Sequence, residues 1–403
     1  MNKKLIAVAV AGALGAPGVA LAQASTVQIY GTLVMNYNYV DQGGGAFGVA
    51  PPAAGSITKA KYDHLNSHDS NLGFKGEEAL GGGLTAWFQC ESTFDPTGAA
   101  SAAGAAAWCG RNSAFGMKGN YGNVYAGNWD TPAKIVMANF RPFSTAGAYG
   151  VTSLWNGTQS NINNVGTSFT RRQQSLISYA TPEFSGFQGY AGWSAANEAA
   201  AQTSATTASK PRLYSFGLQY SNGPLILGGG YETHRNYNPT ASATYTGGTD
   251  RGWSLGAAYT FMGTLKAMAI VTNNKYELSG GTAATQGDLQ GTNFGAYIDW
   301  AFSGPHRVRA GYTKQGESKG SGGTLAAPIL VGNMVANSAG GQTGTGLYAL
   351  QYAYHFSKRT EVNLGYARVV NSQFTSTALQ SLGARPNVGA NQDAWVLGVK
   401  HSF

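Results

Sequence analysis

Charged residues are scarce in this sequence. Asp, Glu, Lys and Arg make up 11% of its 403 residues, whereas ordinary globular proteins carry about 25%. Long apolar runs are also missing after residue 22, which excludes a membrane protein built on helices of about 20 apolar residues. Lys and Arg form no cluster, so the net charge of +8 does not indicate a nucleic-acid-binding surface. No shift in composition divides the chain, and we expect one domain.

Small, polar and aromatic residues take the place of the missing charges. Gly occurs 58 times, Tyr occurs 22 times, and aromatic residues reach 12%. The mean hydropathy is −0.18, so the chain is not strongly apolar either. A β-barrel with hydrocarbon outside and water inside gives this mixture, because half of its strand positions are apolar and the other half are polar but uncharged.

Alternation is clearest in residues 391–403, where the chain ends. Apolar side chains share one parity at Trp395, Leu397, Val399 and Phe403, and small or polar side chains take the other. This period of two predicts a strand. A chain that ends within a strand leaves an open edge unless it pairs, and residues 27–39 alternate in the same way. We expect these two segments to pair, because a bilayer offers no water to satisfy an open edge.

Short turns alternate with long loops along the rest of the chain. The turns lie at 182–186, 222–224, 262–263, 303–305 and 357–359, and the loops lie at 198–210, 236–250, 277–290, 318–344 and 371–391. Such asymmetry is typical of an outer-membrane barrel. The predicted fold is all-β, a 16-stranded antiparallel transmembrane β-barrel. The soluble alternative, a β-propeller, requires a repeat of about 40 residues, and no such repeat occurs.

The amino-terminal residues 1–22 are predicted to be a cleaved signal peptide. Lys3 and Lys4 precede an apolar stretch, and the small residues Ala20 and Ala22 mark a cleavage site. Loss of the two lysines leaves a charge of 24 − 18 = +6. The barrel is then expected to occupy residues 23–403, in the outer membrane of a Gram-negative bacterium.

The two cysteines, Cys90 and Cys109, flank an Ala- and Gly-rich loop. An exported chain meets an oxidising compartment, which favours a disulfide between them. The alternative is two separate thiols, with Cys90 an ordinary outward-facing residue of its strand. Their spacing does not fit a metal-binding or redox motif, and no cofactor is predicted.

Residues 130–168 form the longest connection and are rich in apolar side chains, such as Phe140, Phe143 and Trp155. A loop of this length is functional or disordered, and its apolar content favours the former. Thr131 and Pro132 provide a helix start, which predicts a short helix over 133–139. Such a loop can bury its apolar residues only against the lumen wall, so we interpret it as a constriction loop folded inward.

This loop has no Asp or Glu between residues 131 and 170 but contains Lys134 and Arg141. Charges at a constriction set ion selectivity, and these two residues predict a preference for anions. In the alternative interpretation both side chains point into solvent or pair with wall acids such as Glu77 or Glu91.

Parity places a further set of charged residues on the water-filled face of the strands: Lys75, Glu77, Lys118, Arg172, Arg307 and Arg309. The opposite placement is unfavourable, because Arg or Lys facing lipid at mid-membrane costs about 2–4 kcal/mol. Parity does not give their position along the pore.

Other functions have weaker support. An enzyme would require a nucleophile and a base, and the pair His64 and His68 lies in a Gly- and Pro-flanked segment without helical periodicity, so no metal site is predicted. A substrate-specific channel for a sugar or an organic anion stays open, because Tyr30, Trp87 and Tyr297 face inward by parity. An adhesin or phage-receptor role of the external loops also stays open.

Several motifs resemble those of the general porins of Gram-negative bacteria, in particular the beta-proteobacterial branch. These motifs are VQIYG at 27–31, LGFKGEEALGGGL at 72–84, YGNV at 121–124, Thr131-Pro132, Arg171-Arg172, PEFSGF at 182–187 and GVKHSF at 398–403. The resemblance covers essentially the whole mature chain.

The resemblance implies a homotrimer of 16-stranded barrels, each with a loop folded into its lumen, that solutes cross passively. Together with the charges of residues 130–168, it gives the expectation of a mild anion preference. It implies contact with outer-membrane lipids and lipopolysaccharide, and recognition of the carboxy-terminal strand by the barrel-assembly machinery. Two positions depart from the family pattern, because Gly127-Asn128-Trp129 replaces Gly-Arg-Gln and Ser178 replaces an inward Arg. Fewer wall arginines weaken the expected selectivity.

Overall fold

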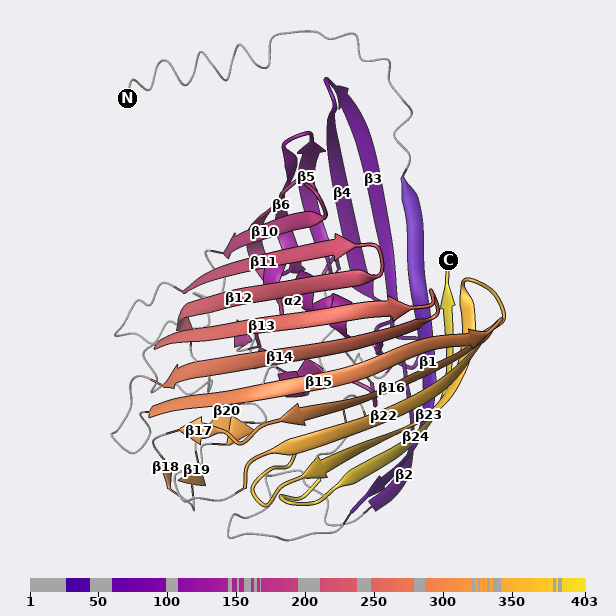
Figure 1. Ribbon diagram of the computed structural model, residues 1–403, viewed down its shortest axis with the longest axis vertical. Helices are drawn as coiled ribbons and strands as arrows, with labels where there is room; N and C mark the ends of the chain where they lie inside the picture. Colours follow the sequence, from indigo (N-terminus) through magenta and orange to yellow (C-terminus); the bar gives the residue numbers. More distant parts are fainter. Residues whose placement is uncertain are drawn as a thin grey trace.

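The computed structural model is a closed β-barrel of sixteen long antiparallel strands (Figure 1). It describes residues 27–43, 60–98, 108–143, 147–150, 152–155, 161–162, 165–166, 168–194, 211–237, 248–278, 287–320, 323–324, 327–328, 330–331, 334–335, 342–379, 382 and 386–403. The predicted signal peptide therefore lies outside the described residues, as do the loop 198–210 and the middle parts of several other predicted loops.

The strands of the barrel follow one another around the wall in chain order. They are β1 (Gln28–Gln42), β3 (Asn71–Gly81), β4 (Leu84–Thr93), β5 (Ser113–Gly119), β6 (Gly122–Asp130), β9 (Arg172–Ala180), β10 (Phe187–Ser194), β11 (Arg212–Asn222), β12 (Leu225–Tyr237), β13 (Gly248–Phe261), β14 (Leu265–Leu278), β15 (Gly287–Ser303), β16 (His306–Gln315), β22 (Thr345–His355), β23 (Thr360–Asn371) and β24 (Gln392–Ser402). The predicted fold class and strand number are confirmed.

The first and last strands close the barrel as expected. β1 and β24 pair antiparallel from Thr32 opposite Ser402 to Gln42 opposite Gln392. The amide of Phe403 also donates to the carbonyl of Gly31, at 3.1 Å. Both edges of the sheet are thus satisfied, as a bilayer requires.

A short strand precedes β3. β2 (Ala60–Asn66) pairs with the far half of β1, and β3 pairs with its near half. A bend at residues 67–70 separates them, where the Val34 amide donates to Ser70 Oγ at 2.7 Å. His64, in the segment flanked by Gly and Pro in the sequence, thus lies on a strand.

Short turns lie at the end of the barrel that holds the amino terminus of β1 and the carboxy terminus of β24. The predicted turns at 182–186, 222–224, 262–263, 303–305 and 357–359 all connect neighbouring strands there. The opposite end carries the long connections, including β17 (Lys319–Gly320), β18 (Gly323–Thr324), β19 (Ala327–Pro328), β20 (Leu330–Val331) and β21 (Met334–Val335). Among the described residues, no helix is long and apolar enough to cross a membrane.

Outward side chains are exposed and apolar along the whole wall. On β24, Trp395, Leu397 and Val399 are 56%, 52% and 46% exposed, while the alternate residues Ala394 and Val396 are buried. The barrel thus inverts the usual arrangement of a soluble protein. Its apolar core lies in the lumen, where the connection between β6 and β9 packs against the inner wall.

Candidate pore constriction

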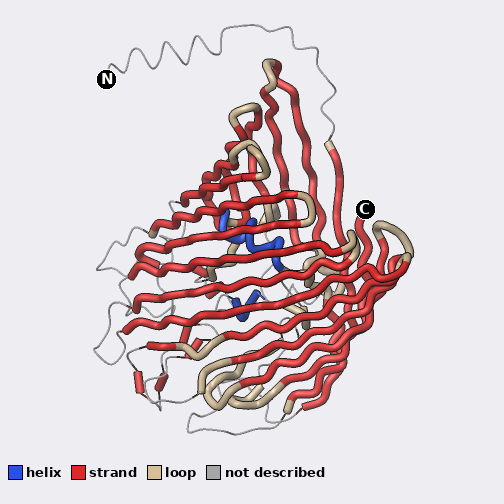
Figure 2. The backbone as a smooth tube through the Cα atoms, viewed as in Figure 1, coloured by secondary structure: helices blue, strands red, loops and turns tan. Residues whose placement is uncertain are grey.

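The connection after β6 folds into the lumen. It contains α2 (Pro132–Met137), the 3-10 helix η2 (Ala138–Phe140), α3 (Thr152–Trp155), β7 (Asn161–Ile162) and β8 (Val165–Gly166). Figure 2 shows its helices enclosed by the strands. The short helix predicted over 133–139 is confirmed, with Thr131 as N-cap residue and Pro132 in the first turn. The Thr131 side chain makes no capping hydrogen bond.

A seat of inward-facing glycines accepts this helix on the wall formed by β10–β13. The seat consists of Gly192, Gly217, Gly228, Gly230 and Gly256. A Cβ atom at Gly228 would lie 2.5 Å from Val136 Cγ1, and one at Gly256 would lie 2.3 Å from Phe140 Cδ2. Val136 and Phe140 are each only 1% exposed. The helix can approach the sheet this closely only because the wall has no side chains there.

The far part of the loop is held by hydrogen bonds to β14 and β15. The indole N–H of Trp155 donates to the Tyr297 hydroxyl at 2.9 Å. The carbonyl of Trp155 accepts from Asn274 at 2.7 Å and from Asn293 at 3.0 Å. These groups are buried, and buried polar groups need such partners. The loop is therefore fixed at two places, by packing on the glycine seat and by hydrogen bonds around Trp155.

A polar cavity of about 390 Å³ lies between the loop and the opposite wall. We call it the constriction cavity. Its charged lining comes from the segment before β3, from β4, β6 and β9, from the segment before β5, from the loop, and from β16, β23 and β24. It comprises the cations Arg111, Lys134, Arg141, Arg172, Arg309 and Lys400 and the acids Asp69, Glu91, Asp130 and Glu361. The balance is 6 − 4 = +2.

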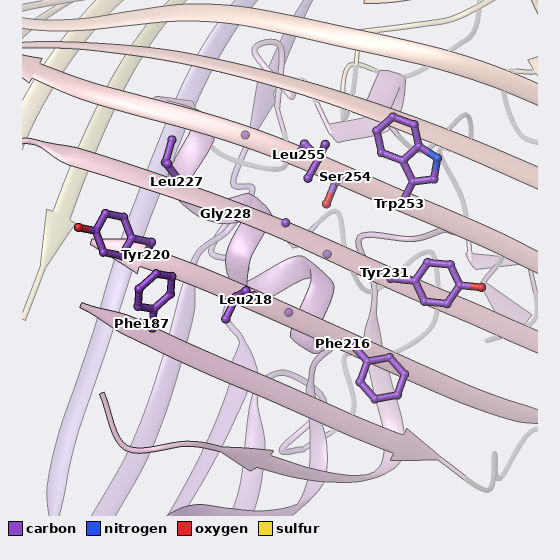
Figure 3. Close-up of a pocket in the computed structure, with 14 residues that line it drawn as sticks. Phe187, Phe216, Leu218, Tyr220, Leu227, Gly228, Tyr231, Trp253, Ser254 and Leu255 are labelled. Carbon is purple, nitrogen blue, oxygen red and sulfur yellow. The ribbon is translucent and has the colours of Figure 1, made fainter. Parts of the chain in front are cut away.

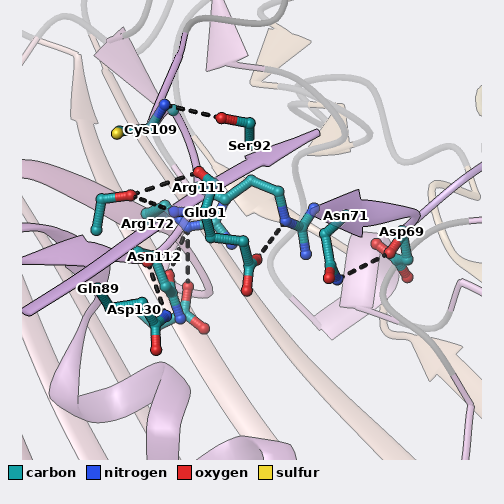
Figure 4. Close-up of polar contacts among 12 residues, drawn as sticks. Asp69, Asn71, Gln89, Glu91, Ser92, Cys109, Arg111, Asn112, Asp130 and Arg172 are labelled. Atoms are coloured by element: carbon teal, nitrogen blue, oxygen red, sulfur yellow. Dashed lines mark hydrogen bonds and ion pairs between the residues drawn. The ribbon is translucent and has the colours of Figure 1, made fainter. Parts of the chain in front are cut away.

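Three of the acids form ion pairs within this lining. Arg111 Nε lies 2.6 Å from Glu91, as Figure 4 shows. Lys134 Nζ lies 2.7 Å from Asp130, which also lies 3.6 Å from Arg172 Nε. Arg309 lies 3.2 Å from Glu361. Among the described residues, Arg141 and Lys400 have no carboxylate within ion-pair distance, and the Arg141 guanidinium donates to the Phe143 carbonyl instead.

Four of the sequence-predicted residues meet in the constriction cavity, namely Lys134, Arg141, Arg172 and Arg309. Lys134 pairs with Asp130, the last residue of β6, so for this residue the alternative of a pair with a wall acid holds, although the acid is Asp130 and not Glu77 or Glu91. Burial lowers the pKa of the Lys134 ammonium, and the Asp130 carboxylate opposes this shift. Lys134 thus lines the pore but is partly neutralised there.

The other four wall residues lie outside the constriction cavity. Glu77 pairs with Lys118 at 2.6 Å, close to the short turns that follow β3 and β5. Arg307 lies 3.1 Å from Asp299, next to the turn between β15 and β16. Lys75 lies over the ring of Tyr30, 5.3 Å from its centroid. Parity alone could not distinguish these positions from the constriction.

Sequence reasoning missed Arg111 and Asp130. Arg111 lies just before β5 and is not among the residues that parity assigns to the water-filled face, and its amide donates to the Glu91 carbonyl at 2.9 Å. Asp130 ends β6 beyond a register shift between Gly127 and Trp129. The only available signal for Asp130 was its spacing of four residues from Lys134, which fits an ion pair across one helical turn.

Cys90 and Cys109 form a disulfide in the structure. The Cys109 amide also donates to Ser92 Oγ at 2.9 Å (Figure 4). The disulfide links the connection before β5, just ahead of Arg111, to the middle of β4. The ion pair of Arg111 with Glu91 lies directly beside it, because Glu91 follows Cys90 and Arg111 lies two residues after Cys109.

A second, strongly apolar hollow lies on the outer face of β10–β13, on the other side of the sheet from α2 (Figure 3). Phe187, Leu218, Leu227, Trp253 and Leu255 line it. These side chains belong to the exposed outer face of the barrel. The hollow is therefore not part of the solute path.

The chain is similar to known bacterial porins over almost its full length. The family model described as "Gram-negative porin" matches residues 7–373. Outer membrane porin protein 32 of Delftia acidovorans is 27% identical, with all of both chains covered. An outer membrane porin protein of Bordetella pertussis is 29% identical over 90% of this chain and 92% of its own.

Solved structures give the same fold. The anion-selective porin from Comamonas acidovorans superposes with a TM-score of 0.72 at 22% identity, over 94% of this chain and 100% of that one. The closed sheet described above agrees with this neighbour. The chain belongs to the Gram-negative porin family and is an outer-membrane diffusion channel.

Proposed function

We propose that this porin passes small hydrophilic solutes and ions passively, with a mild preference for anions, and that residues 130–168 act as its constriction loop. The observation that carries the proposal is the excess of cations in the constriction cavity, where Arg141 has no carboxylate partner among the described residues. Low-dielectric walls focus the field of such charges on passing ions. The ion pairs of Lys134, Arg172 and Arg309 keep the preference mild.

The experiment is a reversal-potential measurement on single channels in planar bilayers under a KCl gradient. We expect the wild-type protein to favour chloride and Arg141→Gln to shift the reversal potential toward potassium. Lys358→Gln, which removes a charge from the exposed turn between β22 and β23, serves as the matched control and should change little. A wild-type preference for potassium, or equal shifts in both variants, would contradict the proposal.

A homotrimer is proposed on the similarity to solved porins. OmpT of Vibrio cholerae, solved in a trimer form, superposes with a TM-score of 0.61 at 15% identity. A mass of three chains in detergent, measured by light scattering, is the expected result. Removal of residues 1–22, contact with lipopolysaccharide, and recognition of β24 by the assembly machinery belong to the same proposal. Because the relatives are channels, we also propose that the chain catalyses no reaction.

A further inference from the structure

Three aromatic side chains gather on the inner wall, on the turn side of the constriction cavity. Trp87 lies on β4, and Tyr125 and Trp129 lie on β6. Their ring centroids are 5.5–5.7 Å apart, and the rings are tilted by 54–68°. We call this group the aromatic triad.

The alternation of the strands places the triad in the lumen. Phe88 and Val124, which adjoin Trp87 and Tyr125, are 41% and 43% exposed on the outer face. The ring of Trp87 covers Gly116 of β5, where a Cβ would lie 2.6 Å from Trp87 Cε2. Its indole N–H donates to Asn123 at 2.8 Å. Trp129 packs against Leu176 and Leu213 of the inner wall.

The two tryptophans are only half-buried, whereas Tyr125 between them is 6% exposed. The triad therefore presents indole surface to the water-filled pore, with Tyr125 as its support. The other wall residues that line the cavity are mostly charged or amide-bearing, apart from Thr32 and Val34, and the loop adds Phe143 and Tyr149. Half-exposed indoles in such a wall offer apolar, π-rich contact that chloride or a small carboxylate cannot use.

The triad continues directly into the charged constriction. Trp129 precedes Asp130, which contacts both Lys134 and Arg172. A solute that leaves the excess of positive charge therefore meets the indole surface next. An aromatic carboxylate matches both the constriction cavity and the aromatic triad. The cations of the cavity attract its carboxylate, and the triad stacks against its aromatic ring.

We propose that the aromatic triad is a binding site for aromatic carboxylates, which makes them preferred solutes of this pore. The proposal rests on the anion preference argued above and adds a substrate class to it. Pairs of aromatic rings gain about 0.5–1.5 kcal/mol beyond the burial of area, equivalent to about a two- to tenfold change in affinity. This is the range expected for a weak site that still releases its solute.

The test measures how far benzoate, acetate and benzyl alcohol reduce the single-channel current when each is added on the turn side. In the wild type, benzoate should block at lower concentration than acetate. The double variant Trp87→Leu/Trp129→Leu should raise the half-blocking concentration of benzoate about two- to tenfold and leave acetate unchanged. Trp300→Leu, a tryptophan on the outer face that is 42% exposed, is the matched control.

The outcomes separate this site from the anion preference. Arg141→Gln should weaken the block by benzoate and acetate alike, whereas the triad variants should weaken only benzoate and benzyl alcohol. Equal blocking by benzoate and acetate in the wild type would overturn the proposal, and so would a double variant with wild-type sensitivity to benzoate. If the double variant forms no channels, the comparison of benzoate with acetate in the wild type still tests the proposal. In addition, Trp129→Phe should retain most of the block by benzoate, because it keeps an aromatic ring.

Discussion

The two walls of the lumen differ in what they contact. On the wall of β10–β13, α2 and η2 pack against the five glycines of the seat so closely that even a Cβ atom at Gly228 or Gly256 would collide with them. The wall around β3–β6 and the last strands carries the charges and the aromatic triad, and it faces the open cavity. One wall therefore fixes the loop, and the other meets the solute. A substitution should act on the channel in a different way depending on the wall that it changes.

The largest expected effect comes from filling the glycine seat. In Gly256→Ala the new Cβ would lie 2.3 Å from Cδ2 of Phe140, a side chain that is only 1% exposed. Overpacking of this kind costs about 1–3 kcal/mol, so η2 should leave its position. We expect a larger and noisier single-channel conductance in planar bilayers.

Gly229→Ala provides the control for this prediction. Gly229 lies on the same sheet but faces outward, where a Cβ would lie 3.0 Å from the flexible end of Leu255. Its conductance should stay at the wild-type value. If Gly256→Ala also conducts like the wild type, the loop does not depend on the glycine seat and the distinction between the walls fails.

A smaller effect is expected from the charged wall. Asp130→Asn removes the acid that contacts Lys134 and Arg172, so two cations of the constriction cavity lose their partner. The preference for chloride should increase, because the remaining field of the cavity becomes more positive. The measurement is the reversal potential under a KCl gradient.

Glu77→Gln is the comparison for this variant, since Glu77 pairs with Lys118 near the short turns and both side chains are largely exposed. Exposed ion pairs are screened by salt and water, so its reversal potential should move less. A larger shift in Glu77→Gln would locate the selectivity at the mouth of the pore instead of at the constriction cavity.

The sequence alone predicts which face of the barrel wall a residue lies on, but not its depth along the pore. A period of two defines the inner and outer faces, so the barrel, its closure and the inward direction of the wall charges could be predicted. Depth along the pore carries no periodic signal. Arg307 and Arg309 are both inward and only two residues apart, yet only Arg309 lines the cavity and pairs with Glu361.

The remaining site residues depend on irregularities that local patterns do not contain. Asp130 reaches the cavity after the register shift beyond Gly127, and Arg111 is placed by a connection that the disulfide ties to β4. The glycine seat is spread over four strands, and its members share a surface only once the barrel has closed. Contacts between residues distant in sequence decided all three features.

The smallest expected effect is a pH dependence that isolates Lys134. Burial lowers the pKa of its ammonium group, against the opposing effect of Asp130, so this charge should be lost at a lower pH than that of an ordinary lysine, near 10.4. The preference for chloride should therefore begin to fall on the acid side of that value. Lys134→Arg should keep its preference over the same range, because a guanidinium stays protonated. Reversal potentials of the two proteins, recorded from neutral to alkaline pH, should diverge as the pH rises. Parallel curves would show that Lys134 does not contribute its charge to the pore, and the selectivity of the solute-facing wall would then depend on its arginines.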